Sequence, residues 1–328
     1  MKRREFITLL AAPVAWPLAA YAQQQERMRR IGVLMGFAEN DEVWQSYLAS
    51  FKRALQELGW TEGRNLRIYY RWAGESAEHT RMAADELVAL GPDLLFVTTN
   101  PALSAVMQAT QQIPIVFTWV SDSVGSGFVA SLARPGGNVT GFHNFEPSMG
   151  GKWLEVLREV APDVRRVAVL YVPEVAANIA LLHAAEAASS GLGVRVVPAA
   201  VRNASDVEQV LTAFAREPNG GLVVTPSPLT GTRRDVIIEM AARLHLPAVY
   251  SFGFYSVSGG LLSYGIDQLE SVRGAASYVD RILRGAHPHE LPVQLPTKFQ
   301  LVINLKTAKA LGLAVPESFL LRADEVIE

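Results

Sequence analysis

The feature that most constrains the fold is a pattern of short apolar segments that occurs twice along the chain. Four such segments begin near residues 30, 65, 93 and 113. Four more begin near residues 166, 194, 221 and 247, so that each follows its counterpart by about 130 residues. Continuous apolar runs of this length are typical of parallel strands that helices cover on both faces. The repeat therefore predicts two α/β lobes of similar build.

Helical patterns alternate with these strands. Ser76 is placed to cap one helix, and Asn100 is placed to cap another that has Pro101 in its first turn. Ser205, with Glu208 three residues later, has the spacing of a capping box. The alternation predicts a doubly wound, Rossmann-like sheet in each lobe. The expected strands are Arg30–Gly36, Asn65–Ala73, Asp93–Thr99, Ile113–Trp119, Arg166–Val172, Val194–Val201, Gly221–Thr225 and Pro247–Ser251.

Further elements follow the second set of strands. A helix is expected around residues 267–285, followed by a proline-rich stretch at 288–296 and a strand and helix over Phe299–Leu311. These elements indicate that the chain crosses between the lobes again. We expect lobe 1 to comprise residues 23–142 plus about 266–292, and lobe 2 to comprise residues 143–265 plus about 293–328.

The first 22 residues have the features of an export signal. Residues 2–4 are Lys-Arg-Arg, residues 6–20 are mostly apolar, and a small-x-small cleavage motif ends at Ala22. Both the general secretory route and the twin-arginine route fit this pattern. We therefore expect residues 1–22 to be a signal peptide that is cleaved after Ala22, which places the mature chain in the periplasm.

Composition excludes several classes of function. The chain has no cysteine, so it has no disulfide, no thiolate metal site and no cysteine nucleophile. Its 30 basic and 32 acidic residues give a net charge of −2, which argues against a partner that is a nucleic acid. His287 and His289 flank a proline in a short loop with Glu290 beside them, and we interpret this loop as solvated and not as a metal site.

Sequence motifs for common enzymes are missing. The chain has neither a glycine-rich dinucleotide fingerprint after its first strand nor a P-loop, and no G-x-S-x-G nucleophile elbow. We therefore expect no catalytic residues, no cofactor and no metal.

The loops after the strands are the expected ligand-binding site, because ligands of open α/β sheets bind beyond the carboxyl ends of the strands. Two lobes that face each other would line a shared cleft with these loops. The loops combine hydroxyls, an amide, carboxylates and aromatic rings, which suits a small organic ligand with one polar end and one flat or apolar part. The candidate residues are Phe37, Thr98, Thr99, Asn100, Trp119, Ser121, Asp122, Thr225, Ser227, Tyr250, Ser251 and Tyr264.

The helix expected to begin at Asn100 is suited to a carboxylate. Its first turn would offer unpaired N–H groups and the positive end of the helix dipole, with Thr98 and Thr99 adding donors. The flat part of the ligand would then lie near Phe37, Trp119 or Tyr250.

Several long stretches of the chain resemble the substrate-binding proteins of ABC transporters, in the group that includes tryptophan- and tyrosine-binding members. The resemblance is carried by Pro114–Gly141, Gly259–Asp267 and Leu291–Leu313, with support from Arg30–Gly59 and Pro162–Val172. It implies a type I periplasmic-binding fold with three crossings between the lobes and closure around a hinge. It also implies a small-molecule ligand, such as an amino acid or aromatic acid, a permease in the inner membrane as partner, and a monomer.

Two departures from the family pattern make the expected pocket less polar. Asp122-Ser123 stands where relatives often carry Asp-Pro, and Phe252-Gly253-Phe254 stands where relatives often have a charged pair. The main alternative function is a periplasmic sensor that presents its ligand to a membrane receptor. A repressor of the same fold would need a DNA-binding headpiece where this chain has its export signal, and the missing motifs argue against a periplasmic enzyme.

Overall fold

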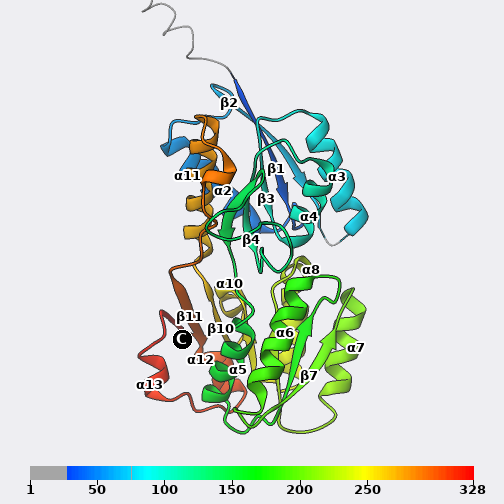
Figure 1. The fold of residues 1–328 in the computed structure, drawn as a ribbon. Coiled ribbons are helices and arrows are strands. Elements are labelled where there is room, and N and C mark those ends of the chain that lie inside the picture. The colour runs from blue at the N-terminus through cyan, green and yellow to red at the C-terminus, as the bar shows by residue number, and fades with distance from the viewer. Residues whose placement is uncertain (1–27, 75) are drawn as a thin grey trace, which may run out of the picture.

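The computed structural model describes residues 28–74 and 76–328, so the expected signal peptide lies outside the described residues. The described chain forms two α/β lobes, each built around its own sheet (Figure 1). The four strands that begin each sheet have the same order, β2-β1-β3-β4 in lobe 1 and β7-β6-β8-β9 in lobe 2, and all pair in parallel. The twofold repeat and the α/β fold expected from the sequence are confirmed.

Lobe 1 contains a five-stranded sheet in the order β2-β1-β3-β4-β5. Helices α2 and α11 pack together and contact the sheet, and α3 packs against α4. The elements are β1 (Arg29–Met35), α2 (Glu42–Glu57), β2 (Leu66–Trp72), α3 (Ala77–Ala89), β3 (Leu94–Thr98), α4 (Asn100–Ala109), β4 (Ile115–Val120), β5 (Val139–His143) and α11 (Gln268–Leu283).

The side chains of β1 show how this sheet is buried on both faces. Ile31, Val33 and Met35 belong to a large apolar core, whereas Leu34 belongs to a second, smaller one that includes residues of α3 and α4. Successive side chains of a strand point to opposite faces, so a strand that is covered on both sides becomes a continuous apolar run. This is why the strands could be recognised from the sequence.

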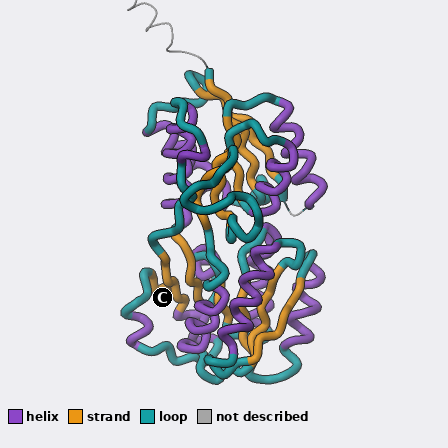
Figure 2. The backbone as a smooth tube through the Cα atoms, in the orientation of Figure 1, coloured by secondary structure: helices purple, strands orange, loops and turns teal. Residues whose placement is uncertain are grey.

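Lobe 2 contains a seven-stranded sheet in the order β12-β11-β10-β9-β8-β6-β7, in which β10 and β11 pair antiparallel. Figure 2 shows strands enclosed by helices in both lobes. The elements are α5 (Met149–Val160), β6 (Arg166–Tyr171), α6 (Ala176–Ser189), β7 (Arg195–Ala200), α7 (Ala204–Phe214), β8 (Gly220–Val224), α8 (Pro228–Thr232), α9 (Arg234–Arg243), β9 (Ala248–Tyr250), α10 (Gly253–Val257), β10 (Leu262–Ile266), a 3₁₀ turn (Pro288–Glu290), β11 (Phe299–Asn304), α12 (Leu305–Ala310), α13 (Glu317–Leu320) and β12 (Glu325–Ile327).

The chain passes between the two sheets three times: after β5, after β10 and before β11. The three passages lie side by side. The backbone N–H of His143 donates to the carbonyl of Gln294 at 2.8 Å, and the N–H of Asp267 donates to the carbonyl of Lys298 at 3.3 Å. The connection between the lobes is therefore a bundle of extended segments held by backbone hydrogen bonds.

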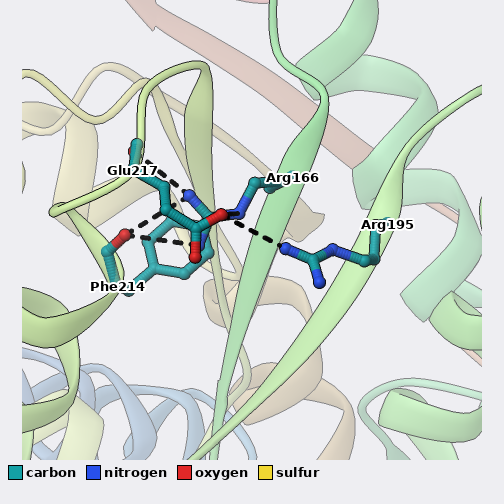
Figure 3. A network of polar contacts seen from close by, with 4 residues as sticks. All are labelled: Arg166, Arg195, Phe214 and Glu217. Carbon is teal, nitrogen blue, oxygen red and sulfur yellow. Dashed lines mark hydrogen bonds and ion pairs between the residues drawn. The ribbon is translucent and has the colours of Figure 1, made fainter.

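A polar network lies at the end of lobe 2 where β6 and β7 begin (Figure 3). The carboxylate of Glu217 contacts Arg166 at 3.2 Å and Arg195 at 3.5 Å, and the Arg166 guanidinium lies 4.5 Å from the centre of the Phe214 ring. The parallel strands β6 and β7 begin at this end of the sheet. The loops at the carboxyl ends of the strands therefore lie at the opposite end. The network joins two strands to the end of α7.

Among residues 28–74 and 76–328, no helix has both the length and the apolar character needed to cross a membrane.

Candidate functional site

A small central cavity lies between the lobes, at the carboxyl ends of strands from both sheets. It is formed by the loops after β1, β3, β4 and β5 in lobe 1 and the loops after β6, β8 and β9 in lobe 2, together with the start of α11. Six of the twelve residues expected from the sequence line it: Phe37, Thr99, Asn100, Trp119, Ser121 and Ser227.

Nine further residues line the cavity, and Phe252 among them belongs to the segment expected in the pocket from the sequence. Trp44 is not among the residues expected in the site, because it shares the apolar spacing of α2, which is typical of a core residue. Gln268 follows the N-cap of α11 and reaches the cavity because the chain crosses back into lobe 1 at this point. The further lining residues are Pro101, Asn144, Val175, Pro226, Pro228, Gly231 and Phe252.

Aromatic side chains of the protein itself leave little room in the central cavity. Phe37 and Trp44 are stacked with ring centres 3.5 Å apart, and Trp119 meets Trp44 at 5.3 Å. Phe254 of lobe 2 packs edge-on against Trp44, also at 5.3 Å. What remains is a cavity of about 20 Å³, which is room for about one water molecule.

Polar atoms without a hydrogen-bond partner gather around this cavity. Among the described residues, they include the indole nitrogens of Trp44 and Trp119, the hydroxyl of Thr99, the side-chain oxygen of Asn144 and the side-chain nitrogen of Gln268. Each of these residues is at least 95% buried and lines the cavity. Buried polar groups are normally hydrogen-bonded, so an unpaired cluster of this kind indicates a place where a ligand supplies the partners. Donors outnumber acceptors in the cluster, which favours a ligand rich in acceptor oxygens.

Three residues of lobe 1 near the carboxyl ends of its strands have an unusual backbone conformation. Thr99, Trp119 and Asp122 have φ angles of +73°, +57° and +46°, which non-glycine residues rarely adopt. Such strained positions cluster at ligand sites because the surrounding structure must hold them in place. Here they turn the chain sharply after β3 and β4, beside the central cavity.

The helix after β3 begins one residue earlier than the sequence suggested. Thr99 is the N-cap of α4, and no side chain caps its N–H groups. Asn100 instead holds two loops together, because its amide nitrogen donates to the Ser121 carbonyl at 2.7 Å and its amide oxygen accepts from the Ser121 N–H at 3.0 Å. The start of α4 therefore faces the cavity with its backbone donors uncapped, while the Asn100 side chain positions the neighbouring loop.

The other six expected residues do not line the central cavity. Thr98 and Thr225 are fully buried, and their hydroxyls serve backbone groups: Thr98 accepts from the Gly36 N–H, and Thr225 donates to the Leu170 carbonyl. Both side chains pack beneath the loops, because a side chain at the end of a strand can point back into the sheet.

The remaining four expected residues also lie outside the lining of the central cavity. Tyr250 stacks on Tyr255 inside lobe 2, and Tyr264 stacks on Phe299 beside the crossing segments. Ser251 is fully buried, and its hydroxyl has no partner among the described residues. Asp122 accepts from the Gly125 N–H and shapes its own turn.

Direct contacts hold the two lobes together around the cavity. Asp41, the N-cap of α2 in lobe 1, forms an ion pair with Arg234 at the start of α9 in lobe 2. The exposed fractions of the two side chains are 9% and 14%. Gly231 also lies close to the aromatic cluster, since a Cβ atom there would lie 3.2 Å from Phe37 and 3.3 Å from Trp44. The structure thus has the two lobes in contact, with the cavity enclosed between them.

Within the described part of the chain, no group of three or more histidine, aspartate or glutamate residues is arranged to hold a metal ion.

Comparisons with known proteins identify a family and several similar proteins. A family model described as "ABC transporter substrate binding protein" matches residues 33–327. A tyrosine-binding protein of Clostridioides difficile is 27% identical over 270 residues, which cover 80% of this chain and 75% of that protein.

Two solved structures are similar to this chain, one with a bound ligand and one without. A domain from Streptococcus pneumoniae in complex with L-Trp has a TM-score of 0.85 at 24% identity, covering 92% of this chain and all of that one. A ligand-free, open substrate-binding protein with adhesive properties from Clostridium difficile has a TM-score of 0.66 at 25% identity, covering 91% and 99% of the two chains.

Proposed function

This chain belongs to the ABC transporter substrate-binding protein family, and from that premise we propose that it captures a small organic carboxylate between its lobes and delivers it to an ABC importer. The observation that carries the proposal is the cluster of unpaired buried donors around the central cavity. The tyrosine-binding relative supports an amino acid or an aromatic acid as ligand.

The carboxylate binds at the start of α4. A buried carboxylate is costly unless several donors serve its two oxygens. The donors at the start of α4 are the N–H groups of Asn100 and Ala102, because Pro101 has no N–H and the Leu103 N–H donates to the Thr99 carbonyl at 3.1 Å. The helix dipole adds positive potential there. The hydroxyl of Thr99 and the indole nitrogens of Trp44 and Trp119 line the same cavity and have no other partner among the described residues.

The protein works outside the cytoplasm, after export under the direction of residues 1–22. Substrate-binding proteins of this family receive their ligand on the outer side of the inner membrane, where the permease collects it. Periplasmic export of this chain therefore agrees with delivery to an importer.

Ligand binding closes the lobes around the hinge. The higher TM-score to the complex with L-Trp than to the ligand-free, open protein supports the view that the present arrangement is the closed one. The Asp41–Arg234 ion pair and the contacts of Gly231 join the lobes in this arrangement.

Calorimetric titration of the mature chain tests the proposal, with aromatic acids and their neutral amides as ligands. We expect one-to-one binding of at least one acid and binding at least tenfold weaker for its amide, because the amide carries no charge to the start of α4. Gln268→Leu removes a cavity donor at nearly constant volume and should weaken binding of the acid. Gln209→Leu, at an exposed position of α7, is the matched control and should leave binding unchanged. Equal affinity for acid and amide would contradict the carboxylate site.

A further inference from the structure

A second, larger cavity adjoins the central one. It has a volume of about 580 Å³ and opens between α3 and α4 of lobe 1 and the loops that precede α6 and α8 of lobe 2. Asn100, Pro101, Val175, Ser227 and Pro228 line both cavities, so the two are in direct contact at the start of α4. We refer to this space as the outer cavity.

The two cavities differ in what they can hold. The central cavity, at about 20 Å³, accommodates a single small polar group, because Phe37, Trp44 and Trp119 pack against one another and occupy the rest. A ligand ring could enter between these residues only by separating the stacked pair. The outer cavity falls within the 300 to 1,000 Å³ that ligand pockets usually have.

The walls of the outer cavity combine apolar and polar side chains, and both lobes contribute apolar ones. Pro101 and Ala105 of lobe 1 face Val175 and Leu229 of lobe 2 across it. The charged lining residues have ion-pair partners: Arg202 is paired with Glu174 at 2.7 Å, and Arg81 is paired with Asp85 at 3.8 Å. A ligand body that lay between Ala105 and Leu229 would bury apolar surface.

Resting on the proposed function, we infer that the ligand is an elongated amphipathic carboxylate that spans both cavities. Its carboxylate occupies the central cavity at the start of α4, and its apolar body extends into the outer cavity between Ala105 and Leu229. The aromatic residues of the central cavity thus form the walls of a head-group site and are not a stacking slot for the ligand. The substrate class is that of arylalkanoic acids whose ring is separated from the carboxylate by a spacer.

Titration with a graded series of acids tests the inference. The probes are benzoate, phenylacetate, 3-phenylpropionate, 4-phenylbutyrate and 5-phenylvalerate, each measured by calorimetry with the mature chain. Each added methylene that becomes buried should tighten binding by about fourfold until the cavity is filled. The heat-capacity change of binding should also become more negative along the series.

Ser104→Trp fills the outer cavity from α4 without touching the central one. In this variant, the longer acids should bind no more tightly than phenylacetate. Ser46→Trp, at an exposed position of α2, is the matched control and should keep the dependence on length. Melting curves of both variants establish that they are folded.

Each outcome has a defined meaning. Benzoate binding as tightly as the longer acids, or Ser104→Trp binding them as wild type does, would overturn the two-cavity arrangement while leaving a carboxylate receptor intact. Binding of none of these acids by the wild-type chain, when a different carboxylate does bind, would overturn the arylalkanoate class alone. Failure of every carboxylate tested would overturn the proposed function together with this inference.

Discussion

A neutral histidine is buried where the chain first leaves lobe 1. His143 is the last residue of β5 and is 3% exposed, and its Nε2 atom accepts a hydrogen bond from the Ser123 N–H at 2.8 Å. Burial lowers the pKa of His143 to about 4, although the nearby carboxylate of Asp122 acts in the opposite direction. Because Nε2 is an acceptor, the proton of the neutral ring lies on Nδ1. Protonation of Nε2 would break this contact between a turn and a crossing segment.

The pKa of His143 predicts how stability depends on pH. The unfolded chain takes up its proton near pH 6.5 and the folded chain only near pH 4, so acid favours the unfolded state. This contribution to stability is fully present above pH 6.5 and is lost as pH falls toward 4, by about 3 kcal/mol. Urea unfolding at pH 7.5 and pH 4.5 measures it. His143→Gln should reduce the difference between the two pH values, whereas His79→Gln, on the surface of α3, should not. An unchanged difference in His143→Gln would show that another group is responsible.

The candidate residues show which parts of the site could be predicted from the sequence and which could not. Phe37, Thr99 and Trp119 could be found because they follow strands, and strand ends meet at one edge of a parallel sheet. Thr98 and Thr225 satisfy the same rule, yet they turn inward, and their inward direction depends on backbone angles that the sequence does not show. Gln268 reaches the cavity only because the chain returns to lobe 1.

Whole elements were easier to predict than their ends. The inner strands, such as β3, β4 and β8, were recognisable because they are buried on both faces, whereas the edge strands β2 and β7 are partly exposed. β12 was missed because its three residues are mostly exposed. Helix caps shifted by one or two residues, since Asn203 and not Ser205 caps α7. Several polar residues near a helix start compete for that role, and tertiary contacts decide which one fills it.

The packing of α5 against α6 depends on a glycine. A Cβ atom at Gly150 would lie 2.0 Å from the carbonyl oxygen of Leu181, so the two helices touch through their backbones at this point. Gly150→Ala should force the helices apart and lower the free energy of unfolding by about 1–3 kcal/mol. Gly191→Ala, just beyond the end of α6, is the control, because its Cβ would meet its nearest neighbour at an ordinary 3.7 Å. Urea denaturation compares the two variants. Equal stability of both would mean that the helices adjust without cost.

At the scale of the whole molecule, the lobes are joined in two ways. The three crossing segments join them permanently and are held side by side by backbone hydrogen bonds. The second connection consists of side chains alone: the Asp41–Arg234 ion pair, the packing of Phe254 on Trp44, and the Arg234 guanidinium 5.9 Å from the centre of the Phe254 ring. Crossing segments persist when the lobes separate, whereas side-chain contacts break. The side-chain group is therefore the part of the molecule that sets how readily the cleft opens.

The ion pair predicts a measurable effect on closure. Both side chains are largely buried when the lobes are in contact, so Arg234→Met would leave the Asp41 carboxylate buried without a cationic partner each time the cleft closes. We expect binding of 4-phenylbutyrate to weaken at least tenfold, mainly through faster dissociation. X-ray scattering should show that saturating ligand reduces the radius of gyration of the wild-type chain more than that of the variant. Arg243→Met, at the exposed end of the same helix, is the matched control and should behave as wild type. If Arg234→Met binds and compacts like the control, the ion pair has no part in closure, and the aromatic contacts around Trp44 must account for it.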